Sequence, residues 1–232
     1  MDLIWRGLIE AVRLILSGDP GILQITWLSI QVSGAATLLS LFAGIPAGVA
    51  LALARFPGRS LLVAVVNTGM GLPPVVVGLF VSIFLWRSGP FGALDLLYTP
   101  TAIIVAQFVI AAPIVTGLTI AAMQQLNPRL RLQFIALGAS RWQMLLLLMR
   151  EARLPLLAAV MAGFGGVISE IGASIMVGGN IKGYSRVLTT ATVMETSKGN
   201  FDVAIALSII LLLLAYVINL VLTQIQQRER PR

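Results

Sequence analysis

The sequence contains neither cysteine nor histidine. Disulfide bonds, thiolate chemistry and histidine-based zinc or haem sites are therefore excluded. It also has no Gly-x-x-x-x-Gly-Lys-Ser/Thr motif, so the chain cannot bind and hydrolyse ATP by that route. An aspartate dyad needs two acidic residues inside the membrane, where Glu170 is the one clear case. We expect no catalytic residue, no metal site and no cofactor in this chain.

Charged residues are also scarce. They make up 11% of the 232 positions, whereas 58% are hydrophobic and the mean hydropathy is +0.95. Soluble domains are about 25% charged, so this composition indicates an integral membrane protein surrounded by lipid. The net charge of +7 is typical of loop arginines that fix the orientation of membrane helices. We therefore expect no nucleic-acid partner.

Five apolar stretches are long enough to cross a bilayer, which takes about 20 helical residues. They are Ile22–Ala54, Leu61–Trp86, Thr101–Met123, Met144–Val177 and Val203–Ile225. An open sheet edge cannot satisfy its backbone in lipid, so all five are predicted helices of an all-α membrane protein. No internal repeat is found, and residues 19–232 are predicted to form one transmembrane domain.

Residues 1–18 follow a different pattern. Asp2, Arg6, Glu10, Arg13 and Ser17 recur at helical spacing and form one polar stripe, with apolar side chains covering the rest. This pattern predicts an amphipathic helix that lies in the membrane interface rather than a sixth span.

The charges between the spans divide into two sets. One side holds ten cations against two anions: Arg55, Arg59, Arg129, Arg131, Arg141, Arg150, Arg153, Arg228, Arg230 and Arg232 against Glu151 and Glu229. The other side holds six of each sign: Arg6, Arg13, Arg87, Lys182, Arg186 and Lys198 against Asp2, Glu10, Asp19, Asp95, Glu195 and Asp202. The positive-inside rule places the first side in the cytoplasm, with the N-terminus outside and the C-terminus inside.

Glycine and proline residues are distributed unevenly among the spans. Gly44 and Gly48 have a small-xxx-small spacing that is typical of close helix packing. Pro73 and Pro74 remove two backbone donors, so we expect a kink in the second span and a position within the bundle.

The segment 127–142 is short, basic and half apolar. Pro128 is well placed at the first position of a helix, and Gly138 is well placed to end it. Leu130, Phe134 and Leu137 have the spacing of one apolar face. A plain amphipathic loop between two spans would show the same pattern.

The stretch Ala136-Leu-Gly138-Ala-Ser140, followed by Glu151-Ala-Arg-Leu-Pro155, resembles the EAA loop of ABC importer permeases. In that family the loop contains a coupling helix that docks into a cytoplasmic ATPase. Leu132-Gln133-Phe134 stands where the family has Glu-Ala-Ala, so the glycine, the helix and the loop carry the resemblance. The resemblance implies a coupling surface made of Arg129, Leu130, Arg131, Gln133, Phe134, Leu137, Gly138, Ala139 and Ser140.

A second constellation covers residues 169–191. Its Ser-Glu-Ile-Gly-Ala-Ser, Gly-Asn-Ile-Lys-Gly-Tyr and Leu-Thr-Thr-Ala segments resemble molybdate and sulfate permeases, and most of all the tungstate permease subgroup. Glycine turns, two cations and several hydroxyls suit an oxyanion. The alternative is an ordinary outer loop whose cations Lys182 and Arg186 are balanced by Glu195 and Asp202.

Candidate pathway or gate residues are drawn mainly from that constellation. They are Pro73, Glu170, Ser174, Gly178, Asn180, Lys182, Ser185, Arg186, Thr189 and Thr190. The role of Glu170 stays open between a proton relay, a structural acceptor and a partner for a cation.

The resemblance implies a MetI-like, type I importer permease fold with a coupling loop at 127–142 and an external loop at 178–201. It also implies a homodimer in a prokaryotic plasma (inner) membrane, two ATPase subunits that hold ATP and Mg, and an external substrate-binding protein. We expect an importer of tungstate, with molybdate, sulfate or another solute as alternatives. A stand-alone ion-coupled carrier or channel that uses Glu170 is a rival from a different class, and a membrane scaffold is a third.

Overall fold

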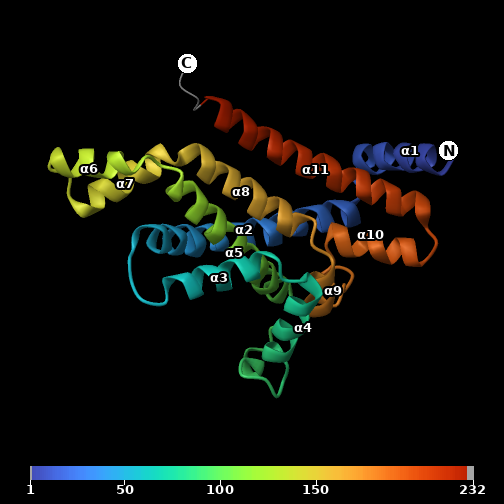
Figure 1. Cartoon of the computed structure of the whole chain (residues 1–232). Helices are drawn as coiled ribbons and strands as arrows, with labels where there is room; N and C mark the ends of the chain where they lie inside the picture. Colours follow the sequence, from blue (N-terminus) through green and yellow to red (C-terminus); the bar gives the residue numbers. More distant parts are fainter. Residues whose placement is uncertain (1, 229–232) are drawn as a thin grey trace.

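A computed structural model of the chain describes residues 2–228. Met1 of the predicted N-terminal helix, and Glu229, Arg230 and Arg232 of the charge count, lie outside this range. The described part is helical, apart from turns and one short 3-10 helix, η1 (Gly92–Leu94) (Figure 1). The α-helices are α1 (Asp2–Ser17), α2 (Pro20–Leu53), α3 (Arg59–Met70), α4 (Pro74–Leu85), α5 (Pro100–Gln124), α6 (Pro128–Ala136), α7 (Arg141–Glu151), α8 (Arg153–Ile168), α9 (Gly172–Gly178), α10 (Leu188–Ser197) and α11 (Phe201–Arg228).

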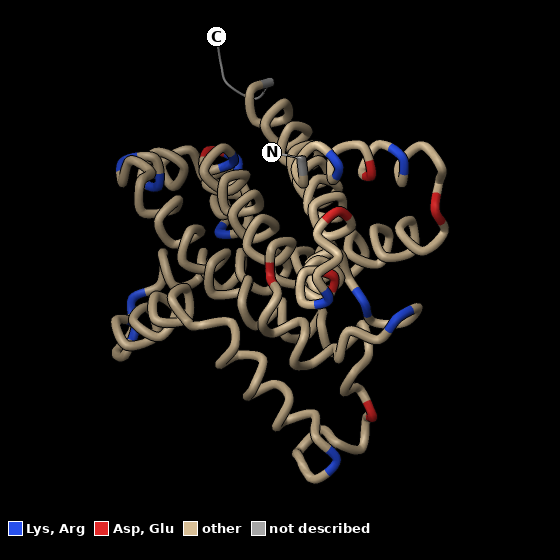
Figure 2. Tube along the Cα trace, turned by 90° about the vertical axis from the view of Figure 1, so that its right-hand side faces the viewer, with Lys and Arg blue, Asp and Glu red and all other residues tan. Residues whose placement is uncertain are grey.

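Three of these helices, α2, α5 and α11, are long and apolar enough to cross a membrane alone. Two bent pairs are long and apolar enough when taken together: α3 with α4, at 104°, and α8 with α9, at 57°. If each bent pair is one span, the described residues hold five spans, the number that the sequence predicts. Long stretches of the helices carry no charge in Figure 2, as a lipid environment requires.

The second span was predicted as one kinked helix over Leu61–Trp86, and the structure breaks it completely. Gly71 caps α3, and Pro73 lies in extended backbone before Pro74 opens α4. Two consecutive residues without an N–H remove two hydrogen bonds of the helical ladder, so the chain turns sharply here.

The fourth span, predicted as Met144–Val177, is also wrong as a single helix. Its first part is α7, which begins at Arg141 because Ser140 caps it. The Ser140 hydroxyl accepts from Gln143 N at 3.3 Å, while the Gln143 side chain accepts from Ser140 N at 2.8 Å. The apolar span itself consists of α8 and α9, separated at Ser169–Ile171.

Close packing of α2 on α5 confirms the small-xxx-small interpretation. A Cβ on Gly44 would stand 2.9 Å from Val115 Cγ1, and one on Gly48 would stand 2.5 Å from Thr119 Cβ. Both distances are shorter than van der Waals contact, so only glycine allows this approach.

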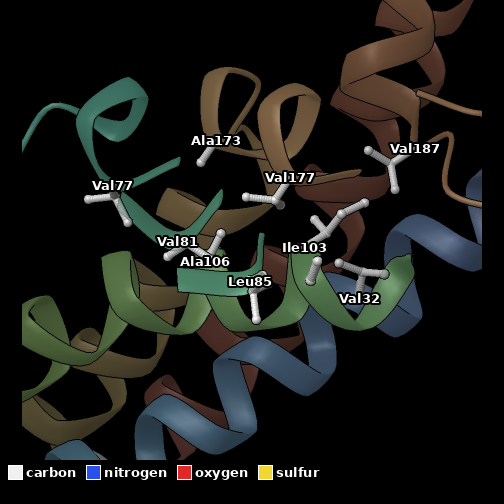
Figure 3. Packing of buried hydrophobic residues seen from close by; sticks show 10 residues of the cluster. Val32, Val77, Val81, Leu85, Ile103, Ala106, Ala173, Val177 and Val187 are labelled. Carbon is white, nitrogen blue, oxygen red and sulfur yellow. The ribbon is translucent and has the colours of Figure 1, made fainter. Parts of the chain in front are cut away.

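Buried apolar side chains form three clusters along the bundle. The first joins α2, α4, α5 and α9 around Ile103 and Val177 (Figure 3). The second joins the last turns of α2 and α5 to α7 and the start of α8, around Val49 and Leu148. The third packs α10 against α11, around Leu188 and Leu207.

Helix α1 (Asp2–Ser17) lies within the predicted range 1–18 and packs along α11, with its small residues Gly7 and Ala11 at the contact. Its large apolar side chains, such as Trp5 and Leu16, are exposed, and Arg13 pairs with Glu10 at 3.7 Å. Its position in the membrane interface stays a prediction.

Candidate functional site

The two sequence segments that were singled out lie at opposite ends of the bundle. Near the start of α2, Gln24 Nε2 donates to Gly183 O at 3.0 Å in the loop that precedes α10. Near the end of α2, Val49 packs in the cluster with Leu148 of α7. Figure 1 accordingly shows α6 and α7 at one end and α10 at the other.

At the first end, α6 and α7 form a helical hairpin. Asn127 caps α6 by accepting from Arg129 N at 2.9 Å, and Pro128 occupies the first turn, as predicted. Gly138 has φ +78°, a left-handed conformation that glycine adopts without steric cost. The chain therefore reverses at Gly138 and enters α7 through the Ser140 cap.

The side chains of α6 are divided between two faces. Leu130 and Phe134 are half-buried against the cluster around Val49 and Leu148. Leu137 is 83% exposed, because it follows the last turn of the helix instead of continuing its inner face. The prediction that these three residues form one apolar face is therefore wrong.

The outward surface of α6 carries other residues. Its exposed apolar side chains are Leu132 (67%), Ile135 (53%) and Leu137. The predicted coupling residues Arg129, Arg131, Gln133, Gly138 and Ser140 are exposed beside them, and Ala139 is half-buried. Exposed leucine and isoleucine at a bundle end suit a protein partner.

At the break between α8 and α9, Glu170 is buried at 7% exposure. Its carboxylate Oε1 accepts from Ala173 N at 2.9 Å in the first turn of α9, and its backbone oxygen accepts from Thr189 Oγ1 at 3.0 Å. Of the three roles left open for Glu170, the structural acceptor is the one these hydrogen bonds support.

The sequence interpretation missed Gln107 of α5, which is 2% exposed. Its Nε2 donates to Val167 O at 3.0 Å and to the buried Ser174 Oγ at 3.4 Å, so it ties α5 to both sides of the break. The sequence could have indicated this role, because an amide side chain inside an apolar span needs a hydrogen-bond partner within the protein.

Most polar groups of the segment 178–190 bond to one another. Ser185 Oγ donates to Gly178 O and accepts from Ile181 N at 3.1 Å. Arg186 Nε donates to Asn180 Oδ1 at 3.1 Å, and its Nη2 donates to Asn180 O at 3.2 Å.

The remaining pathway candidates fall into three situations. Thr190 Oγ1 bonds to both backbone groups of Val187, at 3.0 and 3.1 Å. Pro73 is exposed at the break before α4. Lys182 is exposed and has no side-chain partner among the described residues.

In the ordinary-loop interpretation, Glu195 and Asp202 balance the charges of Lys182 and Arg186. Among the described residues, neither anion forms an ion pair with these cations. Glu195 accepts from Lys198 Nζ at 2.8 Å and from Asn200 Nδ2 at 2.7 Å, instead of pairing with Lys182 or Arg186. A carboxylate oxygen of Asp202, Oδ1, is buried without a hydrogen-bond partner among the described residues.

Sequence comparison finds close relatives along almost the whole chain. The chain is 38% identical over 227 residues to the tungstate uptake system permease protein of Peptoclostridium acidaminophilum, covering 98% of this chain and 100% of the relative. It is 40% identical over 216 residues to a probable anion ABC transporter permease protein of Haloferax volcanii, covering 91% and 93% of the two chains.

Structure comparison supports the same architecture. The methionine ABC transporter in an inward facing conformation matches with a TM-score of 0.76 at 21% identity, covering 91% of this chain and 97% of the other. The predicted type I importer permease fold is therefore confirmed. Residues 44–232 match the family described as binding-protein-dependent transport system inner membrane component, and the chain belongs to this family.

Proposed function

We propose that this chain forms the membrane pathway of an ATP-driven importer for tungstate. The 38% identity to a tungstate uptake permease, end to end, is the observation that supports this substrate. The resemblance of the segment 169–191 to the tungstate subgroup agrees with it. Molybdate and sulfate have the same tetrahedral oxyanion chemistry and are the substrates to test against.

The energy source in this proposal is a separate cytoplasmic ATPase that holds ATP and Mg. The chain has no Walker-type nucleotide motif, while α6 presents exposed Leu132, Ile135 and Leu137 at one end of the bundle. Two copies of the chain would form the pathway, with one ATPase subunit below each copy and an external binding protein that delivers the anion.

The orientation follows from charge. Arg129, Arg131 and Arg141 lie at the α6–α7 end, so the positive-inside rule puts this end in the cytoplasm. The N-terminus then lies outside and the C-terminus inside. Lys182 lies at the outer end, where a free cation would attract an arriving oxyanion.

Coupling in this proposal is mechanical. Closure of the ATPases would move α6, and the packing of Leu130 and Phe134 on the cluster around Val49 and Leu148 would pass that movement to α2, α7 and α8. The break at Glu170 would let α8 and α9 move separately.

Competition uptake tests the substrate. Cells that depend on this chain should take up tungstate at a rate that molybdate and sulfate reduce only when in large excess. If equal concentrations of molybdate or sulfate abolish tungstate uptake, the substrate assignment fails. Uptake by the chain alone in vesicles, without an ATPase, would instead support an ion-coupled carrier.

A further inference from the structure

A groove of about 870 Å³ separates α2 from α7 at the α6 end of the bundle. Apolar residues form its walls, among them Pro46, Val49 and Leu53 on α2 and Leu145 and Met149 on α7. A second groove, of about 880 Å³, adjoins the first and shares Leu53, Ala54, Arg131 and Ile135 with it. The apolar walls suit a hydrocarbon chain, which needs no hydrogen-bonding partners.

Cations surround these grooves. Arg131 and Arg141 line the α2–α7 groove, and Arg55 lines the second one. All three are exposed, and their side chains make no hydrogen bond or ion pair among the described residues. The two unpaired guanidinium groups of Arg131 and Arg141 beside the apolar α2–α7 groove create a site for a molecule with a negative head and an apolar body.

The aromatic residue at the groove fits the same kind of ligand. Trp142 is 78% exposed and follows Arg141 in the first turn of α7. Tryptophan is enriched at the level of lipid headgroups, where one part of its ring meets hydrocarbon and the other meets water. A groove beside such a residue is therefore suited to a ligand that has both a hydrocarbon part and a headgroup.

We propose that the α2–α7 groove binds one anionic phospholipid of the adjoining leaflet. An acyl chain would lie between Val49 and Leu145, and the phosphate would be held by Arg131 and Arg141. Basic pockets between membrane helices are known to hold anionic headgroups, so this chemistry has a physical precedent. The proposed function enters only in assigning the leaflet to the cytoplasmic side.

Lipid titration followed by native mass spectrometry tests the site in the full-length chain purified in detergent. The probes are phosphatidylglycerol and phosphatidylcholine with identical acyl chains. Wild type should bind phosphatidylglycerol more tightly. The pair of substitutions Arg131→Gln and Arg141→Gln should lower that affinity about fivefold per arginine, the effect of one basic side chain at an anionic surface, and leave phosphatidylcholine unchanged.

Arg150→Gln is the matched control, since Arg150 is an exposed cation of α7 that does not line the groove. A steric pair of variants tests the groove itself. Ala50→Phe places a ring in the groove and should weaken both lipids, whereas Ala43→Phe, exposed elsewhere on α2, should not.

The proposal is overturned if wild type binds the two lipids equally, or if Arg150→Gln acts as strongly as the double variant. It is also overturned if phosphatidylglycerol leaves when the ATPase subunits bind, because the arginines would then be ATPase contacts. Lipid binding needs neither substrate nor ATP. A failed tungstate assay with intact lipid selectivity therefore counts against the proposed function alone.

Discussion

Single hydroxyl groups hold the helices of this protein together inside the membrane. Ser29 of α2 accepts from Leu188 N at 2.8 Å while donating to Ile25 O at 2.7 Å, so one side chain fixes the start of α10 against α2. Lipid offers no replacement partner for Leu188 N, and the backbone group would otherwise stay unpaired. At the residue scale, small polar side chains and glycines therefore decide how close the helices come.

We expect Gly48→Ala to destabilise the protein by about 1–3 kcal/mol, the usual cost of adding a methyl group to a packed contact. Its new Cβ would stand 2.5 Å from Thr119 Cβ and 2.7 Å from the backbone oxygen of Thr116. Thermal unfolding in detergent measures the effect. Gly34→Ala in the same helix meets nothing within 4 Å and should leave the unfolding temperature unchanged or raised.

Hydrogen bonds from Asn200 and Lys198 lower the pKa of the Glu195 carboxyl below its ordinary value. A lowered folded-state pKa contributes stability that is present above the unfolded value, about 4.3, and is lost as the pH falls through the folded value. Glu195→Gln should therefore lower the unfolding temperature at pH 7, and the two proteins should converge in acid.

The control for this pH effect is Glu151→Gln, an exposed carboxylate with no partner among the described residues. It should show no such pH-dependent difference. If the difference in unfolding temperature between wild type and Glu195→Gln stays constant from pH 7 into acid, the lowered pKa of Glu195 is not its cause.

At the element scale, the apolar lengths were enough to predict five spans, and the prolines were enough to predict a disturbance near Pro73. They did not predict the 104° and 57° bends, because those depend on contacts between distant segments. Gln107 lies 60 residues from Val167, and Thr189 lies 19 residues from Glu170. Spacing along one helix contains no information about such partners.

Thr189→Val should destabilise the α8–α9 break by about 1–3 kcal/mol. It removes the donor to Glu170 O and leaves that buried carbonyl without the hydroxyl, while the side-chain shape stays nearly the same. Hydrogen exchange of residues 168–175, with the unfolding temperature, measures the loss.

Thr192→Val in the same helix is the matched substitution. Thr192 Oγ1 bonds to Leu188 O within its own helix, four residues back, so its removal frees no carbonyl that depends on it alone. If both variants lose the same protection from hydrogen exchange at residues 168–175, the hydrogen bond to Glu170 does not stabilise the break specifically.

At the scale of the whole molecule, α6 has one face packed on the permease core and another face that is exposed. The sequence predicted a short helix that begins at Pro128 and is ended by Gly138, and α6 has these limits. It assigned Leu130 and Phe134 to the partner, because the amphipathic pattern shows which residues share a face but not whether that face meets the same chain. The structure gives that face to the permease core.

This division predicts two separable defects. Leu132→Glu should weaken co-purification with the ATPase subunits about tenfold, the loss typical of an interface residue with a large share of the binding energy, and leave the unfolding temperature unchanged. Phe134→Ala should lower the unfolding temperature, by less than the ~3–5 kcal/mol lost at a fully buried phenylalanine, because this ring is only half-buried. Leu94→Glu, 59% exposed in η1, is the control and should do neither. If Phe134→Ala releases the ATPase at full stability while Leu132→Glu retains it, the partner binds the opposite face of α6.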